Sequence, residues 1–190
     1  MLPKITALFL AVTATFASAN DEALDALVGT TGEWEGSLYY LDYLDYQSGD
    51  RFSIPMRAMI EATPEGKTIL RRLTWTDPGN LVHAVQLVTF DRDTGEYVEA
   101  YFREGTAEYL RYEVVEVDVV SDSSWLIIYE HDGLDDDRPS RIRHTLERND
   151  DLLTSKKSVR FLDSDDAAYF ERNGSELKMV EATHKSANKP

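Results

Sequence analysis

The chain contains no cysteine among its 190 residues. It therefore has no disulfide, no thiol nucleophile and no cysteine to carry the lipid of a bacterial lipoprotein. Secreted eukaryotic domains often rely on disulfides, whereas a bacterial periplasmic domain of this size can bury enough apolar surface without them. The missing cysteines thus favour a periplasmic protein with one hydrophobic core.

Positive charge is also scarce. The chain has 20 Lys and Arg residues against 35 Asp and Glu residues, and its net charge is −15. Such a chain is repelled by nucleic-acid phosphates and by anionic lipid surfaces. We therefore expect no nucleic-acid partner, and we ascribe the acidity mainly to solubility.

Motifs that signal catalysis are missing from the sequence. It has no Gly-x-Ser-x-Gly, no His-Glu-x-x-His and no phosphate-binding loop. The acidic segments 132–137 and 163–166 lack the spacing of a known calcium loop, and both are expected to be solvated hairpin tips. The four histidines are too scattered for a metal site: His83, His131, His144 and His184. No catalytic or metal-binding residue is assigned, and a binding protein is favoured over an enzyme.

Residues 1–19 have the pattern of a signal peptide. Lys4 supplies the positive region, residues 5–16 are apolar, and Ala17-Ser18-Ala19 fits the cleavage rule. The apolar run is short for a membrane span, although a retained anchor is the alternative. We expect cleavage after Ala19, export to the periplasm or beyond, and no stable membrane anchor.

The rest of the chain is expected to form one domain over residues 20–180, followed by a polar tail at 181–190. A short helix is predicted at 21–28, where Leu24, Leu27 and Val28 share one face and Gly29 can end the helix. No second hydrophobic core or linker is visible.

Beyond the helix, strand-like runs alternate with turn residues every ten to fifteen positions. This spacing predicts an all-β fold, a single up-and-down antiparallel barrel of about eight to ten strands; a two-sheet sandwich is the alternative. The expected strands span 34–43, 51–62, 68–76, 81–91, 96–103, 107–120, 125–131, 141–148, 152–162 and 168–172, with resumption of the last strand at 177–180 as an alternative.

Gly32-Glu33-Trp34 follows the short helix and opens the first strand, and a meander of strands comes after it. This order resembles the calycin superfamily, which includes lipocalins, fatty-acid-binding proteins and poorly characterised bacterial lipocalin-like relatives. The resemblance implies that Trp34 closes the barrel base and that a late arginine, here Arg172, packs across it. It also implies a small hydrophobic or amphipathic ligand inside the barrel.

Strand alternation predicts which side chains line the interior, because successive side chains point to opposite faces. If Trp34 points inward, Asp42 does too, and Lys157 joins the inner face of a later strand. The ligand-binding residues predicted on this basis are Tyr40, Phe52, Ile54, Met56, Trp125, Ile127 and His144.

The leading hypothesis is an exported barrel that binds a small apolar or amphipathic molecule without a cofactor. Three alternatives stay open. His144 on an apolar face allows a haem-binding barrel; interior Tyr, Asp and His side chains allow a barrel enzyme; and a barrel filled by its own side chains would act through a protein partner. The sequence does not predict the oligomeric state.

Overall fold

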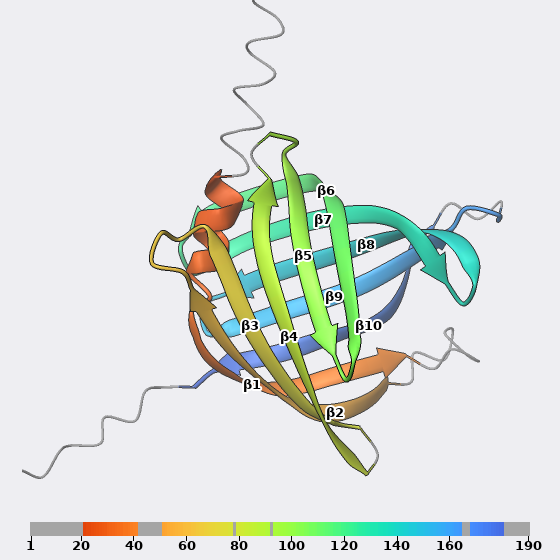
Figure 1. The fold of residues 1–190 in the computed structure, drawn as a ribbon, viewed down its shortest axis with the longest axis horizontal. Helices are drawn as coiled ribbons and strands as arrows, with labels where there is room; N and C mark the ends of the chain where they lie inside the picture. The colour runs from red at the N-terminus through yellow and green to blue at the C-terminus, as the bar shows by residue number, and fades with distance from the viewer. Residues whose placement is uncertain (1–20, 42–50, 78, 92, 165–167, 181–190) are drawn as a thin grey trace, which may run out of the picture.

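The computed structural model describes residues 21–41, 51–77, 79–91, 93–164 and 168–180 (Figure 1). The expected signal peptide, the expected tail at 181–190 and Asp42 lie outside these ranges. Within them, no helix has the length and apolar character needed to cross a membrane.

Ten strands form one closed antiparallel barrel (Figure 1), in the order β1-β10-β9-β8-β7-β6-β5-β4-β3-β2. Each strand pairs with its neighbours in sequence, and β1 also pairs with β10, so the predicted up-and-down barrel is confirmed. The bounds are β1 Gly32–Leu41, β2 Arg51–Ala62, β3 Thr68–Asp77, β4 Asn80–Asp91, β5 Glu96–Arg103, β6 Thr106–Ser121, β7 Ser124–Asp135, β8 Arg138–Asn149, β9 Leu152–Phe161 and β10 Phe170–Met179.

The acidic segment 132–137 forms the end of a hairpin, as the sequence suggested, and Asp132, Asp136 and Asp137 are exposed, but the segment is not solvated throughout. β7 runs through to Asp135, and Asp136 and Asp137 alone make the turn, with φ values of 51° and 59°. Positive φ at both central residues fits a tight two-residue hairpin, and Asp tolerates it better than most residues. Asp135 itself is buried and accepts hydrogen bonds from Lys157 Nζ at 2.8 Å and Arg172 Nε at 2.7 Å.

The last strand is continuous, in contrast to the broken strand that the sequence suggested. β10 spans Phe170–Met179 and pairs with β1 from Tyr40↔Asn173 to Trp34↔Met179. A register shift between Glu171 and Asn173 in the pairing with β9 marks a bulge. A bulge inverts the alternation of side chains, which explains why the pattern read as two pieces.

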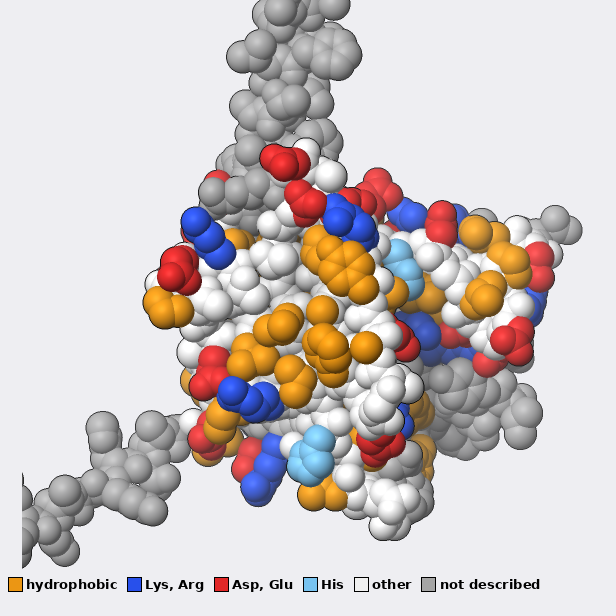
Figure 2. All heavy atoms as spheres, viewed as in Figure 1, with side chains coloured by type: hydrophobic (Ala, Val, Ile, Leu, Met, Phe, Trp, Pro, Cys, Tyr) orange, Lys and Arg blue, Asp and Glu red, His pale blue; other side chains and the backbone are white. Residues whose placement is uncertain are grey.

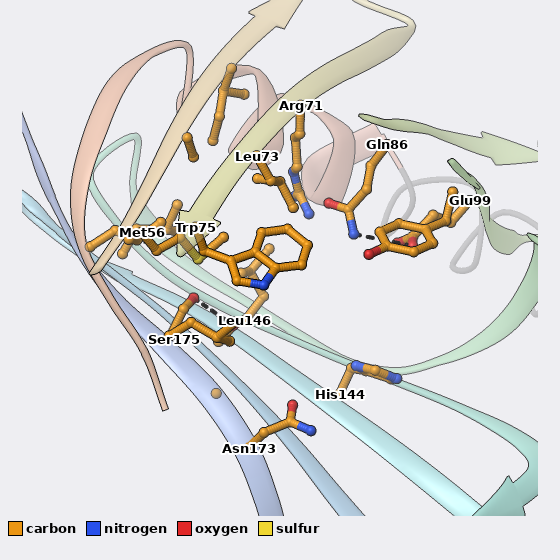
Figure 3. Close-up of a pocket in the computed structure, with 18 of the residues that line it drawn as sticks. Met56, Arg71, Leu73, Trp75, Gln86, Glu99, His144, Leu146, Asn173 and Ser175 are labelled. Carbon is orange, nitrogen blue, oxygen red and sulfur yellow. Dashed lines mark hydrogen bonds between the residues drawn. The ribbon is translucent and has the colours of Figure 1, made fainter. Parts of the chain in front are cut away.

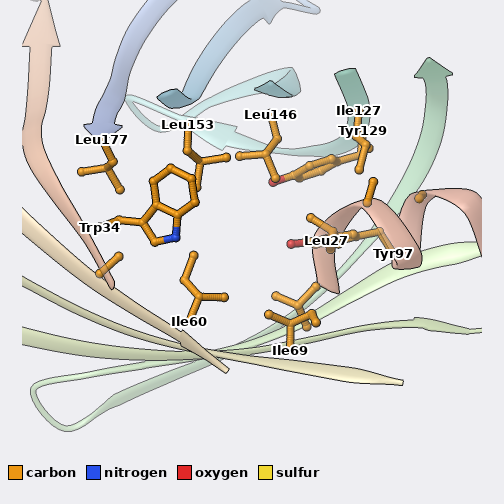
Figure 4. Packing of buried hydrophobic residues seen from close by; sticks show 14 of the residues in the cluster. Leu27, Trp34, Ile60, Ile69, Tyr97, Ile127, Tyr129, Leu146, Leu153 and Leu177 are labelled. Carbon is orange, nitrogen blue, oxygen red and sulfur yellow. The ribbon is translucent and has the colours of Figure 1, made fainter. Parts of the chain in front are cut away.

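One end of the barrel is sealed by the predicted helix, residues 21–28, and by Trp34 (Figure 4). Leu27 and Trp34 are fully buried, and Trp34 Nε1 donates a hydrogen bond to the Thr30 carbonyl oxygen at 2.8 Å. The guanidinium of Arg148 lies 5.6 Å from the centre of the Trp34 ring and donates to the carbonyl oxygen of Gly29. Trp34 thus closes the base as expected.

The arginine at the base is Arg148 and not Arg172, so that part of the expectation was wrong. β1 and β10 are antiparallel, and Trp34 pairs with Met179 while Tyr40 pairs with Asn173. Arg172 therefore lies toward the opposite end of the barrel, where it pairs with Asp135 and faces the Phe170 ring at 4.9 Å. β8 returns to the Trp34 end, which brings Arg148 over the Trp34 ring.

Apolar side chains also gather on the outer wall (Figure 2). Val85 pairs with Phe102, and Ala100 pairs with both Leu87 and Tyr109 across β4, β5 and β6. Leu87, Phe102 and Tyr109 are 40%, 45% and 65% exposed. These strands therefore carry apolar residues on both faces.

Trp34→Ala should lower the free energy of unfolding by about 3–5 kcal/mol, the usual cost of truncating a buried Trp. Urea denaturation followed by circular dichroism measures the loss. The matched control is Tyr109→Ala on the outer wall, which should cost little. A loss for Trp34→Ala of under about 1 kcal/mol would mean that the ring does not seal the base.

Candidate ligand cavity

A cavity of about 280 Å³ lies inside the barrel, and every strand contributes to its lining (Figure 3). This volume lies just below the range typical of small-molecule pockets, so the site suits a small ligand. The barrel is therefore not packed solid by its own side chains.

One wall of the cavity is apolar. Its members come from strands whose buried inward positions alternate with exposed outward ones, as on β2, where Met56, Ala58 and Ile60 are buried. Trp75 on β3 stands in the cavity wall (Figure 3). The guanidinium carbon of Arg103 lies 5.4 Å from the centre of the Trp75 ring. The apolar lining consists of Leu38, Met56, Ala58, Ile60, Leu73, Trp75, Leu146, Leu153 and Leu177.

The other wall is polar, and Arg71 is its most unusual member. Its side chain comes from the inner face of β3, between Ile69 and Leu73, and the residue is 8% exposed. Its Nε and Nη2 atoms are buried and find no hydrogen-bond acceptor within the described part of the chain. Burial lowers the pKa of Arg71, but the neighbouring Tyr97, Tyr129 and Glu99 outweigh that effect and hold it above its ordinary value. The guanidinium is therefore a charged donor group with unused donors.

Glu99 on β5 lies close to this cation. Glu99 is 7% exposed, and Gln86 Nε2 donates to its Oε1 at 3.2 Å. Gln86 pairs with Arg71 across β3 and β4, so its amide stands between the two charged groups (Figure 3). Burial raises the pKa of Glu99, and Arg71 and Gln86 only partly offset this.

Aromatic rings extend the polar wall from β5 to β8. Tyr97 and Tyr129 stack with ring centres 4.4 Å apart, and Tyr129 stacks in turn on His144 at 5.2 Å. Tyr112 packs edge-on against both Tyr129, at 5.0 Å, and His144, at 5.5 Å. The Tyr97 hydroxyl is buried and without a hydrogen-bond partner among the described residues. Such stacking fixes the rings and gives a rigid wall.

His144 is neutral at physiological pH. Burial is the main cause, and His131 and Lys157 add to it; together they lower the pKa of His144 to about 3. A neutral imidazole offers one donor and one acceptor to the cavity. Within the described ranges, no three His, Asp or Glu side chains gather in a way that could hold a metal ion.

The structure brings three of the seven predicted ligand-binding residues to the cavity: Tyr40, Met56 and His144. Ile54, Trp125 and Ile127 are buried in the core without lining the cavity. Phe52 is 56% exposed at the start of β2 and lies outside the cavity, because alternation assigns a face and not a depth along the barrel. Lys157 Nζ forms an ion pair with Asp135 and does not line the cavity.

Sequence reasoning missed Arg71, Gln86 and Glu99. A signal for Arg71 was present, because Ile69, Leu73 and Trp75 mark the inner face of β3 and Arg71 interrupts that apolar series. The signal for Glu99 was weaker, since the apolar outer wall of β5 makes both faces of the strand look internal.

Comparison with known proteins supports the fold and nothing finer. No protein-family model matches the sequence, and a search of curated proteins gave no significant match. The chain is similar in structure to Rv2717c from M. tuberculosis, with a TM-score of 0.52 and 13% sequence identity over 83% of this chain and 97% of that one. At this identity the similarity extends to the barrel alone, which is consistent with the calycin resemblance.

His144 predicts a pH dependence of stability. Its pKa is about 3 in the fold against about 6.5 when unfolded, so the unfolded chain binds a proton first as the pH falls below about 6.5. Stability from this group is therefore lost on acidification. Between pH 7 and pH 5, wild type should lose about 1–2 kcal/mol more than His144→Gln, measured by urea denaturation. Equal losses in the two proteins would show that His144 is not held neutral.

Proposed function

We propose that this chain is an exported, calycin-like protein that binds a small apolar or amphipathic molecule inside its barrel. The observation that carries the proposal is the cavity with one apolar wall and one polar wall whose donors are unused. Pockets that bind small molecules typically combine apolar lining with a few placed polar groups.

Energetics support both halves of the site. Apolar ligand surface that is buried against Met56, Leu73 and Trp75 contributes roughly 25 cal/mol per Å² to the free energy of binding. A buried donor without a partner costs about 1–3 kcal/mol, so a ligand acceptor that meets Arg71 relieves a cost that the empty site carries. An amphipathic molecule satisfies both walls at once.

Haem is the alternative that a specific observation favours. His144 presents a neutral imidazole to the cavity, and a neutral imidazole is the form that ligates iron. A visible absorption spectrum of protein purified from its own host distinguishes this alternative, and native mass spectrometry of the same material gives the mass of any retained ligand.

The binding proposal is tested with N-phenyl-1-naphthylamine, an uncharged probe that fluoresces in apolar surroundings. The probe should gain fluorescence with the wild-type protein and lose that gain with Leu73→Trp, because the larger side chain fills the cavity. Leu87→Trp makes the same change on the outer wall and should bind as wild type does. No gain with wild type, or an unchanged gain with Leu73→Trp, would exclude binding in the cavity.

Export is tested separately. The sequence Ala17-Ser18-Ala19 predicts cleavage after Ala19, so intact mass of protein from the periplasmic fraction should correspond to a chain that begins at Asn20. Full-length chain recovered from the cytoplasm would contradict export.

A further inference from the structure

We propose that the cavity selects a ligand with an anionic head group, that Arg71 binds this group, and that Glu99 takes up a proton when it binds. Capture of the anion would then strengthen as the pH falls. The proposal rests on the proposed binding function and adds the charge of the ligand and its dependence on pH.

The first step is the unused cation. Arg71 is more than nine-tenths buried, its Nε and Nη2 have no acceptor among the described residues, and its guanidinium points into the cavity (Figure 3). Two adjacent N–H donors match the geometry of a carboxylate, sulfonate or phosphate oxygen pair. In this low-dielectric interior, such a charge-assisted contact is stronger than a neutral one.

The second step is that the protein does not fill this position itself. Glu99 is the buried carboxylate beside Arg71, yet it is held by Gln86 and makes no ion pair with Arg71 in the described chain. Gln86 stands between them by register. An external anion can therefore meet Arg71 without displacing Glu99.

The third step is the link to the proton. In the empty site Arg71 lowers the pKa of Glu99 against the larger effect of burial. A bound anion offsets the charge of Arg71 and adds a repelling charge, so the pKa of Glu99 rises further on binding. The complex then holds more protons than the free protein between the two pKa values. Affinity for the anion is therefore greatest at a pH below both pKa values of Glu99, and it declines as the pH rises from the lower value to the higher one.

The remaining charged groups around Glu99 do not account for such a pH dependence. Arg103, on the same strand, is a second cation in the cavity wall, and Glu108 on β6 raises the pKa of Glu99 by repulsion. Glu108 is exposed, so its replacement is a usable control.

Tyr101, Tyr112, Tyr129 and His144 do not titrate in this pH range. Burial raises the pKa of Tyr101 and Tyr112 above 10, and that of Tyr129 to about 12. The pKa of His144 is about 3. None of these groups changes its charge between about pH 5 and pH 8.

The test uses two probes that differ by one charge. 1-Anilinonaphthalene-8-sulfonate is N-phenyl-1-naphthylamine with an added sulfonate, which stays ionised throughout this pH range. Dissociation constants for both probes are measured at constant ionic strength at several pH values. The sulfonate should bind about tenfold more tightly at pH 5 than at pH 8, and the affinity for the neutral probe should not change.

Four variants locate the effect. Glu99→Gln should bind the sulfonate at every pH about as tightly as wild type does at pH 5, while Glu108→Gln should keep the pH dependence. Arg71→Met should bind the sulfonate at least about tenfold more weakly and still bind the neutral probe. Leu73→Trp, which blocks the cavity, should abolish sulfonate binding and so exclude the apolar outer wall as its site.

Calorimetry of the wild-type protein gives a test that needs no variant. Binding enthalpies measured in buffers of different ionisation enthalpy give the number of protons taken up on binding. In the pH range where the affinity for the sulfonate changes, sulfonate binding should take up protons and binding of the neutral probe should not. If the neutral probe binds but the affinity for the sulfonate does not depend on pH, this inference alone is overturned. The same holds if Glu99→Gln keeps the pH dependence of sulfonate affinity that wild type shows. Failure of both probes to bind would overturn the proposed function and this inference with it.

Discussion

The pairing of β1 with β10 is the constraint on which the rest of the structure depends. It joins the first and last strands from Trp34↔Met179 to Tyr40↔Asn173 and so removes both sheet edges. The two strands approach closely there: a Cβ on Gly36 would collide with the Glu176 carbonyl oxygen, and one on Gly174 would collide with the Tyr39 hydroxyl. Closure creates an interior shielded from water, and only in such an interior do the charges of Arg71 and Glu99 acquire their strength.

The two ends of the barrel are secured by different chemistry. At the base, apolar packing dominates: Leu27 of the helix and Trp34 are fully buried, and Arg148 adds donors to loop carbonyl oxygens. Toward the other end, ion pairs link Asp135 to Lys157 and Arg172. Burial alone raises the pKa of Asp135, but Lys157 and Arg172 outweigh it and hold the pKa below its usual value. The helix and Trp34 close one end of the barrel, and the ion pairs of Asp135 join β7 to β9 and β10 toward the other end.

Alternation and turn residues were enough to predict the barrel, the helix and most strand bounds, because both are local properties of the chain. The position of a side chain along the barrel and its partners on other strands are not local properties. Phe52 shares a face with Ile54 and Met56, but its place at the start of β2 leaves it exposed. The arginine over Trp34 is set by which strand returns to the base, so only the strand register identifies Arg148 rather than Arg172. The burial of Asp135 likewise depends on cations from β9 and β10, which the acidic composition of its own segment conceals.

The polar wall is hard to explain as a device for stability alone. Replacing a buried charge by a well-packed apolar side chain is often neutral or favourable, and a buried donor without an acceptor is costly. Arg71 interrupts the inner apolar face of β3, and Tyr97 adds an unpaired buried hydroxyl. A barrel that served only as a filled scaffold would gain from an aliphatic residue at either position. Arg71 lines the cavity, and an unpaired donor in that position suits a site whose hydrogen bonds are completed by a ligand, which favours the proposed binding function over a purely structural one.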